Sequence, residues 1–215
     1  MKDDQLHQDV LDELNFEPSI NAAHIGVAVD DGIVTLSGEV GSFAEKYNAE
    51  RAVRRVKGVH GIVEHIKVVF PSDKVTGDAE IAERVLASLK WSALVPADRV
   101  TVKVENGWVA LNGELDWQFQ KSAAEAAVRR LSGIKGISNL IKLPPQVAGT
   151  NVKQRIEDAL KRNAEVEAQR IQVGVNGSKV ILNGSVDTWH ERNVAESAAW
   201  AVPGVTMVED HLRIA

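Results

Sequence analysis

Apolar and polar residues alternate along this chain in a pattern that occurs three times. The same apolar–polar hairpin sequence stands at Ile33–Val40, Trp108–Leu115 and Lys179–Val186. Each copy carries a glycine at the same place, at Gly38, Gly113 and Gly184. An internal repeat at this interval predicts an array of similar small modules rather than one large domain. We place these modules at residues 1–72, 73–146 and 147–215.

Each module begins with the pattern of an amphipathic helix. Apolar residues recur every four positions with charged residues between them, which builds one apolar stripe along a helix. The stripe occupies equivalent places in the three copies: Leu6, Val10 and Leu14, then Ile81, Val85 and Leu89, then Val152, Ile156 and Leu160. Because all three copies keep it, we assign this stripe to the core.

A hairpin follows the first helix. Residues 25–29 alternate apolar and polar with period two, which is typical of a half-buried strand. The dipeptide Asp31-Gly32 supplies turn chemistry before a second alternating strand. The glycine near the end of that second strand predicts a bulge or a close approach of two backbone segments.

A second, alanine-rich helix and a third strand complete the module. Ser42 with Glu45 and Thr188 with Glu191 form capping boxes, and Asp116 is the expected cap in the second copy. We expect left-handed glycines to stop these helices, at Gly58, Gly133 and Gly204. The strand–helix–strand crossover requires a parallel strand pair. The predicted fold class is therefore α+β, with three tandem αββαβ modules, each a three-stranded mixed sheet with two helices on one face.

The hairpin core resembles that of the BON domain family, named for bacterial osmotically inducible and nodulation proteins. The resemblance rests on the segment Asp31–Val40, on its two copies and on the ending Gly58-Val59 with Ile62, Ile66 and Val68. It covers nearly the whole chain. It implies αββαβ domains that bind phospholipid membranes or hydrophobic partners, and it implies no catalytic residues. Many members are envelope-associated and carry a signal peptide or a lipoprotein anchor.

Composition and charge exclude several kinds of partner. The net charge is −5, and no basic stripe is present to neutralise phosphates, so we expect no nucleic-acid partner. No apolar run approaches the roughly 20 residues of a membrane span. The N-terminus lacks the pattern of a secretory signal, which favours a cytoplasmic location, or an envelope or periplasmic one if a leader has been removed. Exposed edges of the short sheets could pair between chains, so a homo-oligomer is an open alternative.

Candidate catalytic and metal-binding patterns are missing from the sequence. It contains no glycine-rich phosphate loop, no zinc-protease motif and no nucleophile elbow. None of the six histidines recurs in all three copies, and the chain has no cysteine. We therefore expect a protein that is not an enzyme and that has no metal and no cofactor.

Aromatic residues break the repeat, and this makes them the candidate binding residues. Positions that hold Trp or Phe in one copy hold Lys, Arg, Ser or Gln in another, so they need not be buried. Aromatic side chains with one apolar and one polar end are favoured at membrane interfaces and binding surfaces. The candidate lipid or partner surface comprises Phe43, Trp108, Trp117, Phe119, Trp189 and Trp200. The competing interpretation is that these rings pack between modules.

The leading hypothesis is a non-enzymatic binding protein, related to stress, that recognises a phospholipid surface or a hydrophobic partner. Its aromatic side chains would insert at the level of the lipid headgroups. The alternative is a protein-interaction or chaperone-like module that binds no lipid.

Overall fold

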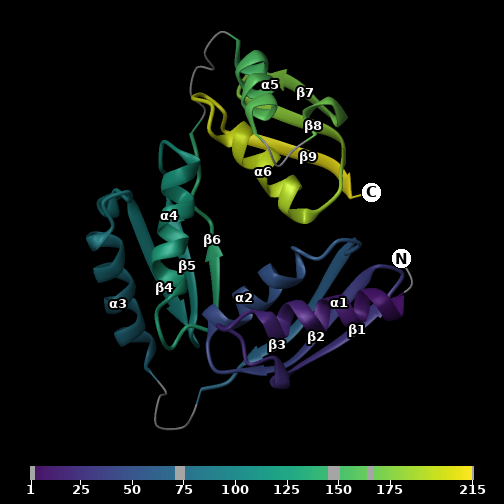
Figure 1. The fold of residues 1–215 in the computed structure, drawn as a ribbon. Coiled ribbons are helices and arrows are strands. Elements are labelled where there is room, and N and C mark those ends of the chain that lie inside the picture. Colours follow the sequence, from purple (N-terminus) through teal and green to yellow (C-terminus); the bar gives the residue numbers. More distant parts are fainter. Residues whose placement is uncertain (1–2, 71–75, 145–150, 164–166, 215) are drawn as a thin grey trace.

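The computed structural model describes residues 3–70, 76–144, 151–163 and 167–214 of the chain. Within them, three modules follow one another, and each has the order helix, strand, strand, helix, strand (Figure 1). The first module contains α1 Asp3–Phe16, β1 Ile25–Asp30, β2 Ile33–Val40, α2 Phe43–Val53 and β3 Gly61–Val68. The second contains α3 Asp78–Trp91, β4 Val100–Glu105, β5 Trp108–Gly113, α4 Gln118–Arg129 and β6 Gly136–Asn139. The third contains α5 Val152–Arg162, β7 Ile171–Asn176, β8 Lys179–Val186, α6 Trp189–Trp200 and β9 Met207–Ile214.

Each module has its own mixed sheet. The strand orders are β1-β2-β3, β4-β5-β6 and β7-β8-β9, with the first pair of each sheet antiparallel and the second pair parallel. The parallel pair is the one joined through the second helix, as a crossover requires. The predicted α+β class and the αββαβ topology are confirmed.

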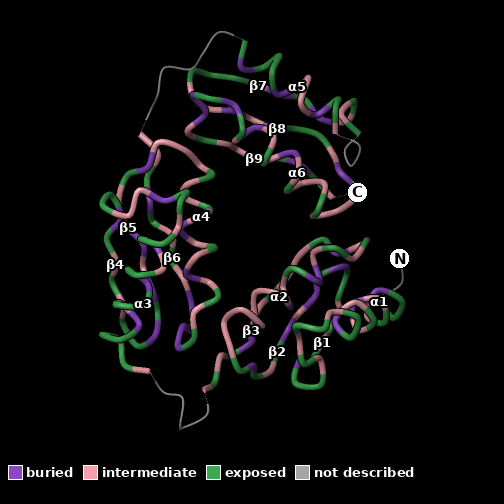
Figure 2. Tube along the Cα trace, turned by 60° about the vertical axis from the view of Figure 1, so that its left-hand side comes forward, coloured by how far each residue is buried: buried purple, intermediate pink, exposed green. Residues whose placement is uncertain are grey.

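Each module also has its own core, built by the first helix, the sheet and the second helix. The predicted stripes are buried, including Leu6, Val10 and Leu14 on α1. Small residues such as Ala49 and Ala52 on α2 are fully buried, because a helix with short side chains can lie close to a sheet. Figure 2 shows buried segments along the strands and helices of all three modules.

The repeated hairpin glycine marks a close approach of two backbone segments. Gly184 adopts φ +129°, and a Cβ atom there would lie 2.0 Å from the carbonyl oxygen of Arg170. Gly38 and Gly113 have the same geometry against His24 and Arg99. The expected close approach is therefore present in all three copies.

The expected glycine C-caps are not where the second helices end. Helix α2 ends at Val53 with Arg54 in the right-handed helical region, and tight turns through Arg55 and Val56 follow. Gly58 takes its positive φ only beyond those turns, and Gly133 and Gly204 do the same. The prediction that these glycines stop the helices is wrong, because the chain leaves the helix through a tightened last turn first.

Candidate functional site

The three second helices, α2, α4 and α6, form the inner side of the molecule (Figure 1). Residues of all three line one cavity of about 1100 Å³. Its lining includes four aromatic rings, those of Tyr47, Trp117, Phe119 and Trp200. The structure therefore brings three of the six sequence-predicted candidates, Trp117, Phe119 and Trp200, to one place.

Trp189 joins the third module to the first. It is the first residue of α6, yet its half-buried ring packs against the hydrophobic core of the first module. The guanidinium carbons of Arg54 from α2 and Arg192 from α6 lie 5.1 and 4.8 Å from its ring centroid. The indole nitrogen is buried and, among the described residues, has no hydrogen-bond partner. Apolar packing and two cation–π contacts therefore hold this ring in place.

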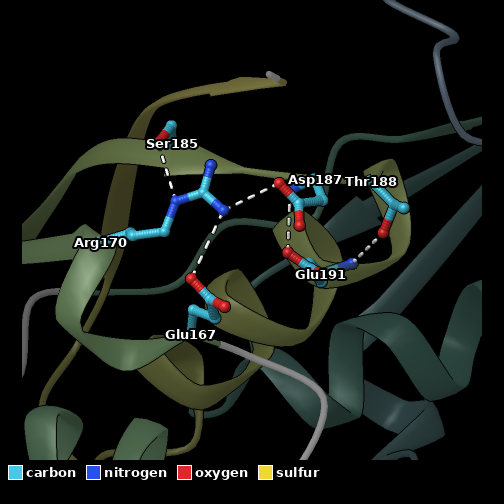
Figure 3. A network of polar contacts seen from close by, with 6 residues as sticks. All are labelled: Glu167, Arg170, Ser185, Asp187, Thr188 and Glu191. Atoms are coloured by element: carbon cyan, nitrogen blue, oxygen red, sulfur yellow. Dashed lines mark hydrogen bonds and ion pairs between the residues drawn. The ribbon is translucent and has the colours of Figure 1, made fainter.

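A polar network holds the backbone at the start of α6, directly before Trp189 (Figure 3). The Arg170 guanidinium donates to Asp187 Oδ1 at 2.8 Å and to Ser185 Oγ at 3.3 Å. The backbone N–H of Asp187 donates to Glu191 at 2.9 Å, and the N–H of Glu191 donates to Thr188 Oγ1 at 3.1 Å. Thr188 therefore caps the helix as predicted, but Glu191 accepts from Asp187, one residue before the cap, so the capping box is only half formed. Arg170, from the short helical turn Ala168–Arg170, extends the network.

Phe43 and Tyr47 join the first module to the second. Phe43 opens α2 and packs against the core of the second module. One turn later, the Arg129 guanidinium lies over the Tyr47 ring, 3.6 Å from its centroid. The beginning of α2 thus meets the end of α4, just as the beginning of α6 meets the end of α2. Phe43 and Trp189 hold equivalent places in the repeat, and both contact a neighbouring module.

Trp108 and Phe119 lie at the surface. Both are 54% exposed. The Trp108 ring lies across Gly136 on the neighbouring strand, where a Cβ atom would come within 2.2 Å of the ring. Because it has no side chain, this glycine leaves room for the ring against the backbone of β6.

Two aromatic residues outside the candidate set are the most exposed of all. Trp91 is 89% exposed and Phe16 is 82% exposed, and each is the last residue of the first helix of its module. Leu86 and Leu94 near Trp91 are 49% and 57% exposed. The repeat could have indicated their exposure, since this position is aromatic in two copies and is Arg162 in the third. A ring just beyond the last buried residue of an amphipathic helix has no core left to enter.

The second copy caps its helix differently from the prediction. Asp116 receives two hydrogen bonds from Arg99, at 2.6 and 3.1 Å, and Gln120 accepts from the backbone N–H groups of Asp116 and Trp117 instead. The expected role of Asp116 as the cap is therefore wrong. The hydrogen bonds from Arg99 hold the pKa of the Asp116 carboxyl below its ordinary range.

Removing this pair should change the acid stability of the second module. Because the folded-state pKa of Asp116 is lowered, the pair stabilises the fold above the unfolded value of about 3.9, and the contribution disappears as pH falls through the folded-state pKa. Arg99→Met should therefore lower the midpoint of thermal unfolding at pH 7 and have less effect at pH 2. Thermal unfolding followed by circular dichroism across this range tests it, and a difference that does not change with pH would contradict it.

The described residues contain no group of three or more His, Asp or Glu side chains arranged to hold a metal ion. No helix in the described part of the chain is long and apolar enough to cross a bilayer.

Comparison with known proteins agrees with the repeat. The model of the BON domain family matches residues 2–69, 77–145 and 149–215, which is nearly the whole sequence. The chain belongs to the BON domain family. A curated relative is Osmotically-inducible protein Y of Escherichia coli (strain K12), with 32% identity over 131 residues. That match covers 58% of this chain and 64% of the relative, so it leaves more than a third of the relative unmatched.

Two solved structures also align with this BON protein over most of its length. One is described as CdsD, a structural protein of the type III secretion system of Chlamydia trachomatis, with 14% identity, 98% of this chain and 92% of the other covered, and a TM-score of 0.27. The other is the C-terminal domain of CdsD, with 12% identity, full coverage of both chains and a TM-score of 0.26.

Proposed function

We propose that this protein binds a phospholipid surface as part of a stress response, by inserting exposed aromatic side chains at the headgroup level. The observation that carries the proposal is the exposure of Trp91 and Phe16 at the ends of α3 and α1. The similarity to an osmotically inducible protein supports the stress-related role.

Apolar insertion, rather than charge, should provide the affinity. The net charge of −5 gives no general attraction to anionic lipid. Transferring one Trp side chain from water to the interfacial region contributes roughly 1.5–3 kcal/mol. Trp91 and Phe16 together should add avidity, because the second ring inserts while the first holds the protein at the surface.

Vesicle co-sedimentation tests this proposal. The wild-type chain should sediment with phosphatidylcholine vesicles, and its tryptophan emission should shift to the blue. Trp91→Ser combined with Phe16→Ser should weaken binding by tenfold or more, as expected from the loss of roughly 1.5 kcal/mol or more. Trp108→Ser, compared with Trp91→Ser, is the matched control, since both changes remove an indole ring from an exposed position.

Three results would overturn the proposal. If neither zwitterionic nor anionic vesicles retain the protein, the lipid hypothesis fails and the partner hypothesis takes its place. If only the Trp108 variant loses binding, the ends of α1 and α3 are not the inserting sites. If all variants bind equally, aromatic insertion is not the mechanism.

A further inference from the structure

One glutamate of each second helix lines the central cavity at the same place in the repeat. These residues are Glu50 on α2, Glu125 on α4 and Glu196 on α6. In the first two copies an arginine four residues later neutralises the carboxylate. Arg54 lies 2.6 Å from Glu50 and Arg129 lies 2.9 Å from Glu125.

The third copy replaces this arginine with Trp200. Its indole N–H donates to Glu196 Oε1 at 3.2 Å, which is a hydrogen bond to a neutral donor rather than an ion pair. Among the described residues, Glu196 has no cationic partner. Of the three equivalent carboxylates in the described part of the chain, Glu196 is therefore the one without an ion pair, whereas its two counterparts are paired.

Aromatic rings line the same cavity as Glu196. Trp200 lines it from the end of α6, and Trp117 and Phe119 line it from the beginning of α4. A carboxylate without an ion pair, in a cavity lined by aromatic rings, is the chemistry that recognises an organic ammonium group. The face of an aromatic ring attracts a cation, and water competes poorly for an alkylated one. We call Trp117, Phe119, Glu196 and Trp200 the α4–α6 wall.

We propose that the α4–α6 wall is a binding site for an organic ammonium group, primary or quaternary, carried by a small amphipathic molecule. The size of the cavity suits a molecule larger than the ammonium group alone. Arg51 lines the same cavity from α2 and has no ion-pair partner among the described residues. The far end of the ligand is therefore neutral or anionic, since a second cation would meet the Arg51 guanidinium.

The first test compares the affinity of the full chain for choline and for its uncharged carbon isostere, dimethylbutanol. No vesicles are present, so membrane binding plays no part. The two probes share their shape and differ in charge. Titration calorimetry at low salt should show choline binding about tenfold more tightly than the alcohol, the ratio expected for a desolvated cation–π site. Equal affinity for the two probes, or no binding of choline, would overturn the proposal.

The second test uses variants at equivalent positions of the three copies. Trp200→Arg installs the residue of the other two copies, pairs Glu196 and should reduce choline affinity by about tenfold. Glu196→Gln should do the same, while Glu125→Gln, the equivalent change at a paired carboxylate, should leave affinity within about twofold. Circular dichroism checks that each variant is folded. If Trp200→Arg is not folded, the comparison of Glu196→Gln with Glu125→Gln alone tests the role of Glu196. Equal losses for both glutamine variants, or no loss for either, would overturn the assignment of Glu196.

Discussion

Gly184→Ala is expected to unfold the third module. Gly184 lies at φ +129°, where an L side chain is strained, and its new Cβ would meet the Arg170 carbonyl oxygen at 2.0 Å. That oxygen belongs to the backbone directly before β7, so relieving the contact requires the start of β7 to move away from β8, its partner in the hairpin. We expect a loss of about 4 kcal/mol or more. A module of this size is stable by roughly 3–10 kcal/mol, so most of its stability would be lost.

Gly174→Ala is the matched control in the same hairpin. A Cβ there makes only ordinary contact, 3.6 Å from Ile181, and the first module carries Ala28 at the equivalent position. This variant should be neutral or slightly stabilising, because alanine loses less backbone entropy than glycine on folding. Urea unfolding followed by tryptophan fluorescence compares the two. A Gly184→Ala protein that unfolds at the wild-type urea concentration would show that the backbone shifts easily at this point.

The repeat explains why the fold could be predicted from this sequence and why one detail could not. Three independent copies of each position distinguish core from surface, as with Leu14, Leu89 and Leu160, which are all buried. Helix ends depend on local hydrogen bonding that the repeat does not report. The turns after Val53 therefore separate the helix from Gly58, although the alignment of glycines suggested a direct cap.

The candidate site was harder to predict for a different reason. Sequence alignment compares equivalent places within modules, whereas the cavity and the joints are contacts between modules. Phe43 and Trp189 aligned with each other, but nothing in the sequence says that each ring enters a neighbour. Trp91 and Phe16 also aligned, and their position at the helix end was the available signal for their exposure.

Trp189→Ala is expected to release the third module from the first. The change removes the ring that packs on the first core and both of its cation–π contacts, with Arg54 and Arg192. We expect a loss of about 2–3 kcal/mol of docking free energy, since the ring is only half-buried. The cavity takes its walls from all three modules, so it should open in the same variant. Small-angle X-ray scattering should then show a larger radius of gyration, with the secondary structure unchanged by circular dichroism.

Trp189→Phe separates packing from hydrogen bonding at this joint. The Trp189 indole nitrogen is buried without a partner among the described residues, so removing it deletes no hydrogen bond and relieves the cost of burying a donor. The phenyl ring keeps an apolar surface and a face for both arginines, although its cation–π contacts are weaker than those of an indole. These effects oppose each other, and the variant should stay within about 1 kcal/mol of wild type. If Trp189→Phe opens the molecule as far as Trp189→Ala does, the joint depends on the full indole ring rather than on apolar contact. If Trp189→Ala scatters like wild type, Phe43 and the walls of the cavity hold the three modules together without it.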